Sequence, residues 1–195
     1  MRIQAGKFKG RVLLPPPRDA QTRPITGRAR KSLFDTLAPW LDEAVVLDMY
    51  SGTGTMGFEA LSRGAAHCIF AEKDRRVISR LKTNIRDCGV GEHATVWCGD
   101  IQVTLRPRLA GLDEMLDLVF VDPPYVDARR WDWQKAEASI FAPLAGKLAD
   151  DGLVVLRTPK GVIVPQTLAG LTEFRTKTYG SMVVTLLGKP GEPDE

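Results

Sequence analysis

Short apolar runs alternate with amphipathic segments along most of the chain. Runs rich in apolar and β-branched residues at 44–50, 67–74, 94–100, 116–125 and 152–158 are typical of buried strands. Between them, residues 54–64, residues 75–89 and a part of 133–149 have apolar side chains at helical spacing. Strands that alternate with helices predict a parallel sheet covered by helices on both faces.

The segments on either side of this core have different patterns. Residues 1–17 contain short extended stretches broken at Gly6 and Gly10 and end in a proline run, which predicts a small β-hairpin and a stiff connector. A helix should begin near Thr26, because apolar residues recur at helical spacing from residue 33 to residue 41. Residues 173–188 predict two strands joined at Gly180 and Ser181, a hairpin that closes one edge of the sheet.

A length of 195 residues suits one domain with a small appendage. We therefore expect an α/β, doubly wound fold at residues 22–189, with a mostly parallel sheet of seven strands that ends in the C-terminal antiparallel hairpin. Residues 1–21 form the predicted basic hairpin and connector, and residues 190–195 a flexible tail.

Composition narrows the class of protein. A hydrophobic content of 44% and a charged content of 26% are those of an ordinary globular domain. We find no apolar run of membrane-spanning length and no signal peptide, so we expect a cytoplasmic protein without a membrane partner. The three cysteines and two histidines do not have the spacing of metal ligands, so no metal is expected.

Positive charge is concentrated at the start of the chain. Residues 1–31 contain nine Lys or Arg residues and one acidic residue, whereas the remainder contains 18 basic and 23 acidic residues. A basic segment on a mildly acidic body predicts a polyanionic partner that approaches from one side. The residues we assign to binding this polyanion, which the family resemblance described below implies is RNA, are Arg2, Lys7, Lys9, Arg11, Arg23, Arg28 and Arg30.

A glycine-rich turn follows the first predicted strand, in the stretch LDMYSGTGTMG. Gly52, Gly54 and Gly57 have the G-x-G-x-x-G spacing of dinucleotide-binding folds, so a nicotinamide or flavin cofactor is one interpretation. Asp48 favours another ligand, because a carboxylate before this turn would repel a pyrophosphate at the helix N-terminus. S-adenosylmethionine carries a sulfonium and an ammonium group and no phosphate, and it suits an acidic turn better.

Acidic residues end four successive predicted strands: Asp48, Glu72, Asp100 and Asp122. Glu72 is placed to accept hydrogen bonds from both ribose hydroxyls of such a cofactor. Asp100 could accept one from the adenine amino group while Ile101 packs on the ring. In a doubly wound sheet, ligands bind beyond the carboxyl ends of the strands, so we expect these side chains to share one site.

The fourth strand ends in the stretch DPPY. Pro123 and Pro124 cannot donate to a strand ladder and fix the direction of the chain, so they hold Asp122 and Tyr125 rigidly. With the glycine turn, this stretch resembles the S-adenosylmethionine-dependent methyltransferases that modify exocyclic amino nitrogens. The resemblance implies that a carboxylate and a main-chain carbonyl accept the two amine hydrogens while the tyrosine stacks on a base taken out of its stack.

Longer stretches are similar to one family in particular. MRIQAGKFKGRVL, TRPITGRARKSLFDTL and VLDMYSGTGTMGFEALSRGA occur in the order found in the RsmD family of bacterial 16S ribosomal RNA guanine-N2 methyltransferases. The resemblance implies a Rossmann-like class I methyltransferase fold, S-adenosylmethionine as cofactor, and a guanine of small-subunit ribosomal RNA within an assembly particle as substrate. It implies cofactor binding by Asp48, Tyr50, Ser51, Gly52, Gly54, Glu72, Lys73, Asp100 and Ile101, and catalysis by Asp122, Pro123, Pro124 and Tyr125.

Several alternatives stay open at this point. A nicotinamide oxidoreductase explains the glycines but not DPPY or the basic segment. A protein glutamine methyltransferase would more often have Asn in place of Asp122. A DNA adenine N6 or a transfer RNA guanine N2 methyltransferase shares the chemistry, and a non-catalytic RNA-binding module would bind no cofactor.

Overall fold

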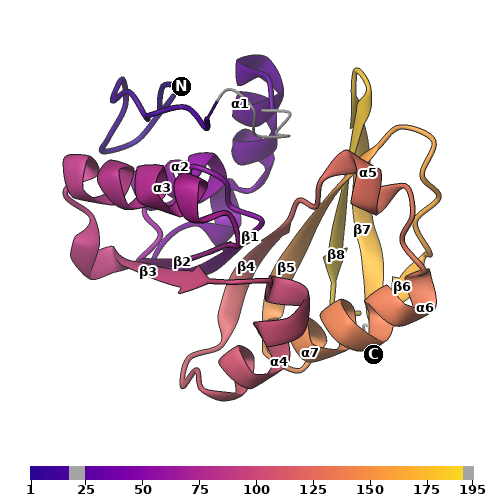
Figure 1. Ribbon diagram of the computed structural model, residues 1–195. Helices are drawn as coiled ribbons and strands as arrows, with labels where there is room; N and C mark the ends of the chain where they lie inside the picture. Colours follow the sequence, from indigo (N-terminus) through magenta and orange to yellow (C-terminus); the bar gives the residue numbers. More distant parts are fainter. Residues whose placement is uncertain (18–24, 191–195) are drawn as a thin grey trace.

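One mixed sheet of eight strands organises the molecule (Figure 1). The computed structural model describes residues 1–17 and 25–190. The strand order is β3-β2-β1-β4-β5-β8-β7-β6. The first five strands in this order run parallel, and β8, β7 and β6 are antiparallel. The strands are β1 (Val45–Met49), β2 (His67–Glu72), β3 (Ala94–Cys98), β4 (Leu116–Val121), β5 (Leu148–Pro159), β6 (Thr167–Leu168), β7 (Leu171–Tyr179) and β8 (Met182–Gly188).

Helices cover both faces of this sheet. One face carries α1 (Gly27–Thr36), α2 (Thr55–Ser62) and α3 (Arg75–Cys88), and the other carries α4 (Ile101–Ala110), α6 (Trp133–Ala136) and α7 (Ala142–Ala145) (Figure 1). A π-helical segment (Glu137–Phe141) joins α6 to α7. The remaining helical segments are α5 (Tyr125–Ala128) and the 3-10 turns η1 (Ala38–Trp40) and η2 (Gly91–His93).

The alternation of side chains along the central strands β1 and β4 explains why these strands are almost entirely apolar. Val46 and Phe120 belong to the core under α1–α3, whereas their neighbours Leu47 and Val121 belong to the core under α4 and α7. A strand between two helical layers has no face toward water, so it reads as a continuous apolar run. The expected doubly wound α/β fold is confirmed.

The sheet also sets the place of a ligand site. The chain runs outward from β1 to β2 and β3, then crosses back to β4 on the other side of β1. The carboxyl ends of β1 and β4 therefore meet where the strand order reverses, which is where doubly wound sheets bind ligands.

Three details of the fold differ from the expectation. The sheet has eight strands instead of seven, because the two residues of β6 pair with β7. Helix α4 was not expected: Ile101, Leu105 and Leu109 are buried at a spacing of four, but Pro107 inside the helix interrupts its pattern. The N-terminal hairpin consists of one antiparallel bridge between Arg2 and Val12.

Two predicted features lie outside the described residues: the boundary at residues 21 and 22, and all of the predicted tail except residue 190.

The N-terminal arm, residues 1–14, is bound to the body of the protein and does not stand free. The Ser62 hydroxyl donates to the Ala5 carbonyl at 2.5 Å and accepts from the Phe8 amide at 2.9 Å. The Asn84 side chain accepts from the Leu14 amide at 2.8 Å. These bonds fix the arm along α2 and α3.

In the described parts of the chain, no helix is long and apolar enough to cross a membrane. Nor do these parts bring together three or more His, Cys, Asp or Glu side chains that could hold a metal ion.

Glu59 is the buried centre of the contact between the arm, α1 and α2. Its carboxylate accepts from the Gln4 amide at 2.9 Å and pairs with the guanidinium groups of Arg30 (3.0 Å) and Arg63. The side chains of Glu59 and Arg30 are 1% and 4% exposed, so both charges depend on each other for compensation.

We expect Glu59→Ala to lower the free energy of unfolding by about 3–5 kcal/mol, because two arginines then lose their buried partner. Urea denaturation measures this change. Glu92→Ala, at an exposed position in η2, is the matched control and should stay within about 0.5 kcal/mol of the parent protein. Equal midpoints for the two variants would show that the buried pairs contribute nothing.

Candidate functional site

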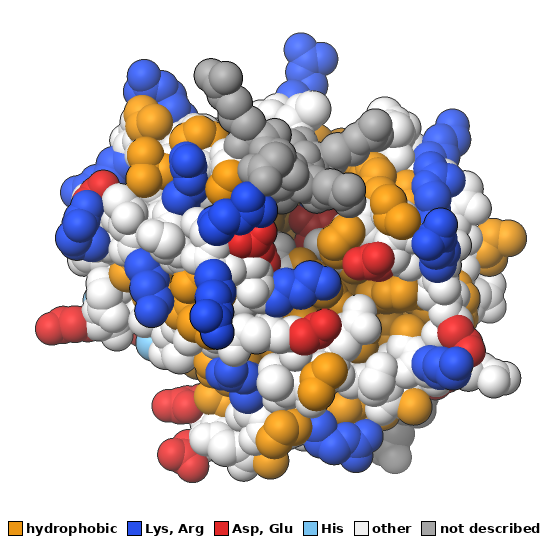
Figure 2. Space-filling view, in the orientation of Figure 1, with side chains coloured by type: hydrophobic (Ala, Val, Ile, Leu, Met, Phe, Trp, Pro, Cys, Tyr) orange, Lys and Arg blue, Asp and Glu red, His pale blue; other side chains and the backbone are white. Residues whose placement is uncertain are grey.

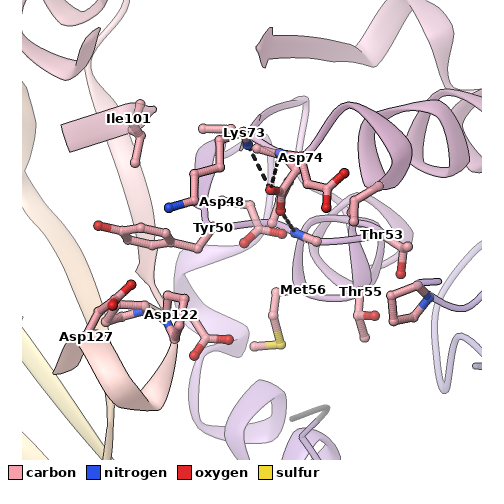
Figure 3. A pocket seen from close by; sticks show the side chains of 18 of the residues that line it. Asp48, Tyr50, Thr53, Thr55, Met56, Lys73, Asp74, Ile101, Asp122 and Asp127 are labelled. Atoms are coloured by element: carbon pink, nitrogen blue, oxygen red, sulfur yellow. Dashed lines mark hydrogen bonds between the residues drawn. The ribbon is translucent and has the colours of Figure 1, made fainter. Parts of the chain in front are cut away.

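A cavity of about 810 Å³ lies at the carboxyl ends of β1–β4, where the sheet order reverses (Figure 3). It brings together twelve of the thirteen residues predicted for cofactor binding and catalysis. They are Asp48, Tyr50, Ser51, Gly52, Glu72, Lys73, Asp100, Ile101, Asp122, Pro123, Pro124 and Tyr125. Gly54 is not in the wall of the cavity.

The turn after β1 is shaped by residues in left-handed conformations. Tyr50 has φ 61°, Gly52 has φ 57° and Gly54 has φ 90°. A Cβ on Gly54 would lie 2.6 Å from the Phe58 ring, so this glycine serves packing beneath the turn. The Ser51 amide donates to the Ala71 carbonyl at 2.9 Å, which ties the turn to the end of β2.

Gly57 allows α2 to pack directly on the sheet. A Cβ there would lie 2.3 Å from the Phe70 ring and 2.5 Å from the Cys68 sulfur. The third glycine of the motif therefore serves close contact between helix and strand, as in dinucleotide-binding folds. This closeness also brings the first turn of α2 within reach of the side chain of Asp48.

Asp48 is a buried carboxylate directed at the N-terminus of α2. Its side chain, 1% exposed, accepts a hydrogen bond from the Gly57 amide at 2.9 Å. Burial, helped by the nearby carboxylates of Asp122 and Glu72, raises its pKa to about 7, while the Gly57 amide and Arg157 act in the opposite direction. The carboxylate of Asp48 thus already accepts a hydrogen bond at this helix N-terminus.

Glu72 is held by the backbone around it. One carboxylate oxygen accepts from the Gly52 amide at 3.0 Å, and the other from the amides of Lys73 (2.8 Å) and Asp74 (2.9 Å). Three fixed donors orient the carboxylate between the glycine turn and the start of α3. A carboxylate offers about four acceptor positions, so a ligand can still donate to it.

The third strand end forms the far wall of the cavity. Asp100 caps α4 by accepting from the Gln102 amide at 3.0 Å, and Ile101 beside it is buried. The Gln102 side chain donates to the Tyr50 hydroxyl at 3.1 Å. Burial raises the pKa of Tyr50 to about 12, so this hydroxyl stays protonated near neutral pH.

Asp122 is paired with an arginine that the sequence analysis did not single out. The Arg157 guanidinium donates to both carboxylate oxygens at 2.5 Å, and the two side chains are only 12% and 19% exposed. Burial raises the pKa of Asp122, and Arg157 acts against this shift. Val121 of β4 pairs with Leu156 of β5, so the next residues, Asp122 and Arg157, face each other. The sequence does not reveal this register.

The structure separates the residues predicted to bind RNA into different groups. Arg2, Lys7, Lys9, Arg11 and Arg28 are exposed, and Figure 2 shows Lys and Arg side chains on several sides of the face around the cavity. Arg23 lies outside the described residues.

The assignment of Arg30 to RNA binding is wrong. Its side chain is buried, pairs with Glu59 and donates to the Arg2 carbonyl at 2.7 Å. The sequence shows only that it is a cation in a basic segment, and the acid that neutralises it is 29 residues further along the chain.

Comparisons with known proteins agree with this fold. The solved structure of an RNA methyltransferase from Salinibacter ruber in complex with S-adenosyl-L-homocysteine has the same fold (TM-score 0.59, 18% identity, 89% of this chain and 98% of that chain). The fold is therefore that of a Rossmann-like methyltransferase.

The chain belongs to the family described as Conserved hypothetical protein 95, the RsmD family, which matches residues 1–188. Ribosomal RNA small subunit methyltransferase D of Escherichia coli K12 is 33% identical over 199 residues, with 100% of this chain and 93% of that protein covered. A hypothetical protein of Thermus thermophilus, with a solved structure, has a TM-score of 0.78 and 31% identity over 96% of this chain and 99% of that one.

The raised pKa of Asp48 predicts a dependence of stability on pH. The folded state holds the Asp48 proton up to about pH 7, whereas an ordinary aspartate releases it near 3.8. The contribution of Asp48 to stability is therefore most favourable at low pH and is lost as the pH rises through this window.

Asp48→Asn keeps an acceptor for the Gly57 amide and removes the titration, so we expect its stability relative to the parent protein to improve from about pH 5 to about pH 8. Urea midpoints at the two pH values measure the difference. Asp113→Asn, at an exposed position, should show no such trend. A pH-independent difference for Asp48→Asn would contradict the assignment.

Proposed function

We propose that the chain is an S-adenosylmethionine-dependent methyltransferase that methylates the exocyclic N2 amine of a guanine in small-subunit ribosomal RNA. The observation that carries this proposal is the position of residues 122–125 in the wall of a cavity that three further strand-end carboxylates also line. The name of the Escherichia coli relative, ribosomal RNA small subunit methyltransferase D, supports the class of substrate.

The acidic groups of the cavity fit S-adenosylmethionine better than a dinucleotide. A pyrophosphate would need the free amides at the start of α2, but the carboxylate of Asp48 already accepts from Gly57 there. The same carboxylate is suited to the cationic end of the methionine part. Glu72 would accept from a ribose hydroxyl through its remaining acceptor position, and Asp100 and Ile101 would hold the adenine. When bound, the cofactor supplies an activated methyl group on its sulfonium.

The role of Asp122 in this reaction is to prepare a weak nucleophile. The lone pair of a guanine amine is delocalised into the ring, and acceptors for both N–H groups turn it toward the methyl group. Asp122 would accept one N–H, and a main-chain carbonyl of the Pro123–Pro124 stretch the other. After transfer the nitrogen carries an extra proton, which leaves to Asp122 or to water.

Arg157 has a supporting role in this scheme. Each oxygen of Asp122 accepts one bond from Arg157 and keeps a lone pair for the amine. Burial favours the protonated form of Asp122 and raises its pKa, and the Arg157 guanidinium opposes this shift by favouring the ionised form, which is the form that can accept the amine proton.

The N-terminal arm would bring the RNA to the cavity. Its exposed cations Arg2, Lys7, Lys9 and Arg11 are suited to phosphates, while Met1 and Pro16 line the cavity itself. RNA held by the arm therefore lies beside the site of transfer. The substrate we propose is ribosomal RNA within a small-subunit assembly particle.

The decisive experiment gives the protein labelled S-adenosylmethionine together with total RNA, small-subunit particles and DNA from cells that lack its gene. The label should appear as N2-methylguanine in small-subunit ribosomal RNA. Label in transfer RNA or in DNA adenine would reassign the substrate, and no label with any nucleic acid would remove the proposal.

For the cofactor site, we expect Glu72→Ala to weaken binding of S-adenosylmethionine by about 1.5–3 kcal/mol, the usual loss for hydrogen bonds to a charged group. Glu72→Gln retains one acceptor oxygen and should lose less. Calorimetry measures both, with Glu114→Ala at an exposed position as the control. Binding of NADH in place of S-adenosylmethionine would overturn the assignment.

For the reaction itself, we expect Asp122→Asn to lower the single-turnover methylation rate roughly 10- to 150-fold, as for loss of a hydrogen bond to a charged acceptor. Its affinity for S-adenosylmethionine should stay near that of the parent, since the interaction is made mainly in the transition state. Thermal unfolding checks that the variant is folded. A folded variant that methylates at the parental rate would exclude Asp122 from the chemistry.

A further inference from the structure

A second cavity, of about 530 Å³, adjoins the first and has no part in the scheme above. It lies between the start of α1 and the turn that joins β7 to β8. Ile25 and Tyr125 line both cavities, so the Tyr125 side chain stands at their boundary. The other residues around it are Thr26, Arg28, Ala29, Ser32, Tyr179, Gly180, Ser181 and Met182.

The wall of the second cavity also holds a second aromatic ring, that of Tyr179, in a defined position. The Tyr179 hydroxyl donates to the Ser32 hydroxyl oxygen at 3.2 Å, across the gap between β7 and α1. The Lys177 ammonium donates to the same oxygen at 2.9 Å and lies 5.3 Å from the centre of the Tyr179 ring. The ring is therefore fixed before any ligand arrives.

The surface of this cavity combines three features that suit an unpaired nucleobase. Two tyrosine rings provide faces for stacking, and the buried side chains of Ile25, Ala29 and Met182 provide an apolar floor. Hydroxyl groups such as that of Ser32 lie at the edge, where a base has its donors and acceptors.

Charge distinguishes the two cavities. The main cavity is lined by Asp48, Glu72, Asp100 and Asp122 among other residues, which suits a cationic ligand. Among the described residues that line the second cavity none is acidic, and Arg28 at its edge is exposed. Lys160, whose amide donates to the Ser181 carbonyl at 2.8 Å, adds an exposed cation next to the turn. Phosphate groups on either side of a base would meet favourable charge here.

We propose that this second cavity binds the nucleobase next to the target guanine on the same RNA strand, with Tyr125 between the two bases. The inference rests on the proposed function, because it takes the target base to occupy the main cavity. Two adjoining cavities with a shared wall suit two bases that are neighbours in the same strand. The bases lose their mutual stacking when they enter separate cavities, and the Tyr125 ring between them would replace it. Contacts to such a neighbour set the sequence context of enzymes that take a base out of its stack.

The experiment uses short single-stranded RNAs with one guanine, in which the nucleotide before or after it is either intact or abasic. An abasic nucleotide retains its phosphate, so the electrostatic part of binding is the same in each pair. Binding is measured by fluorescence anisotropy in the presence of S-adenosylhomocysteine. For the parent protein, loss of the base on one of the two sides should weaken binding roughly 5- to 150-fold, the range for one base stacked on one aromatic ring.

Variants of Tyr179 make the test specific for the second cavity. Tyr179→Ala should discriminate between the intact and the abasic RNA of that pair clearly less than the parent, because only the Tyr125 ring is left to stack on the base, whereas Tyr179→Phe keeps the ring and should discriminate like the parent. The matched control is Phe174→Ala, which removes an exposed aromatic ring from β7 at a position that does not line the cavity, and it should discriminate like the parent. Thermal unfolding verifies that each variant is folded.

Either of two results would overturn the inference: the parent protein binds intact and abasic RNAs equally, or Tyr179→Ala discriminates as the parent does. These outcomes are separate from those of the labelling experiment. Methylation of guanine without discrimination removes only the second cavity from RNA recognition, whereas discrimination without methylation of any nucleic acid removes the proposed function.

Discussion

The hydrogen bond from the Gly57 amide to the Asp48 carboxylate determines what kind of ligand the main cavity can hold. A helix N-terminus after a glycine-rich turn usually attracts phosphate. Here the protein's own carboxylate is in that place, 2.9 Å from the amide, and is almost completely buried. The turn therefore keeps the shape of a dinucleotide site but has the opposite charge preference. Gly57 makes this possible, since any Cβ there would push α2 away from β2.

A site built on buried carboxylates needs a cation to offset them. Asp48 and Asp122 lie at the ends of neighbouring strands, and the charge of Asp122 adds to the electrostatic cost of ionising Asp48. Arg157 compensates from the next strand, through bonds to both oxygens of Asp122. The main cavity is thus lined by several carboxylates, and the cation that offsets them is bonded to Asp122.

Much of this arrangement could be predicted from the sequence, because its determinants are local. Continuous apolar runs identify strands between two helical layers, and parallel strands bring their carboxyl ends to one edge of the sheet, so Asp48, Glu72 and Asp122 could be expected together. The failures concern partners that are distant in the chain. Whether Arg30 or Arg157 faces solvent or a buried acid depends on packing, and nothing in a basic segment or at a strand end distinguishes these outcomes.

The position of Tyr125 at the boundary of two cavities has a consequence for how such an enzyme could evolve. A residue that touches two neighbouring sites cannot be altered for one without disturbing the other. Recognition of the surrounding RNA and the reaction at the target base would then both depend on the Tyr125 side chain. New specificity is more accessible through the second wall, where Tyr179 and Ser32 lie away from the carboxylates. If the second cavity binds the neighbouring base as proposed, substitutions in the hairpin of β7 and β8 would change the choice of target with little effect on the reaction.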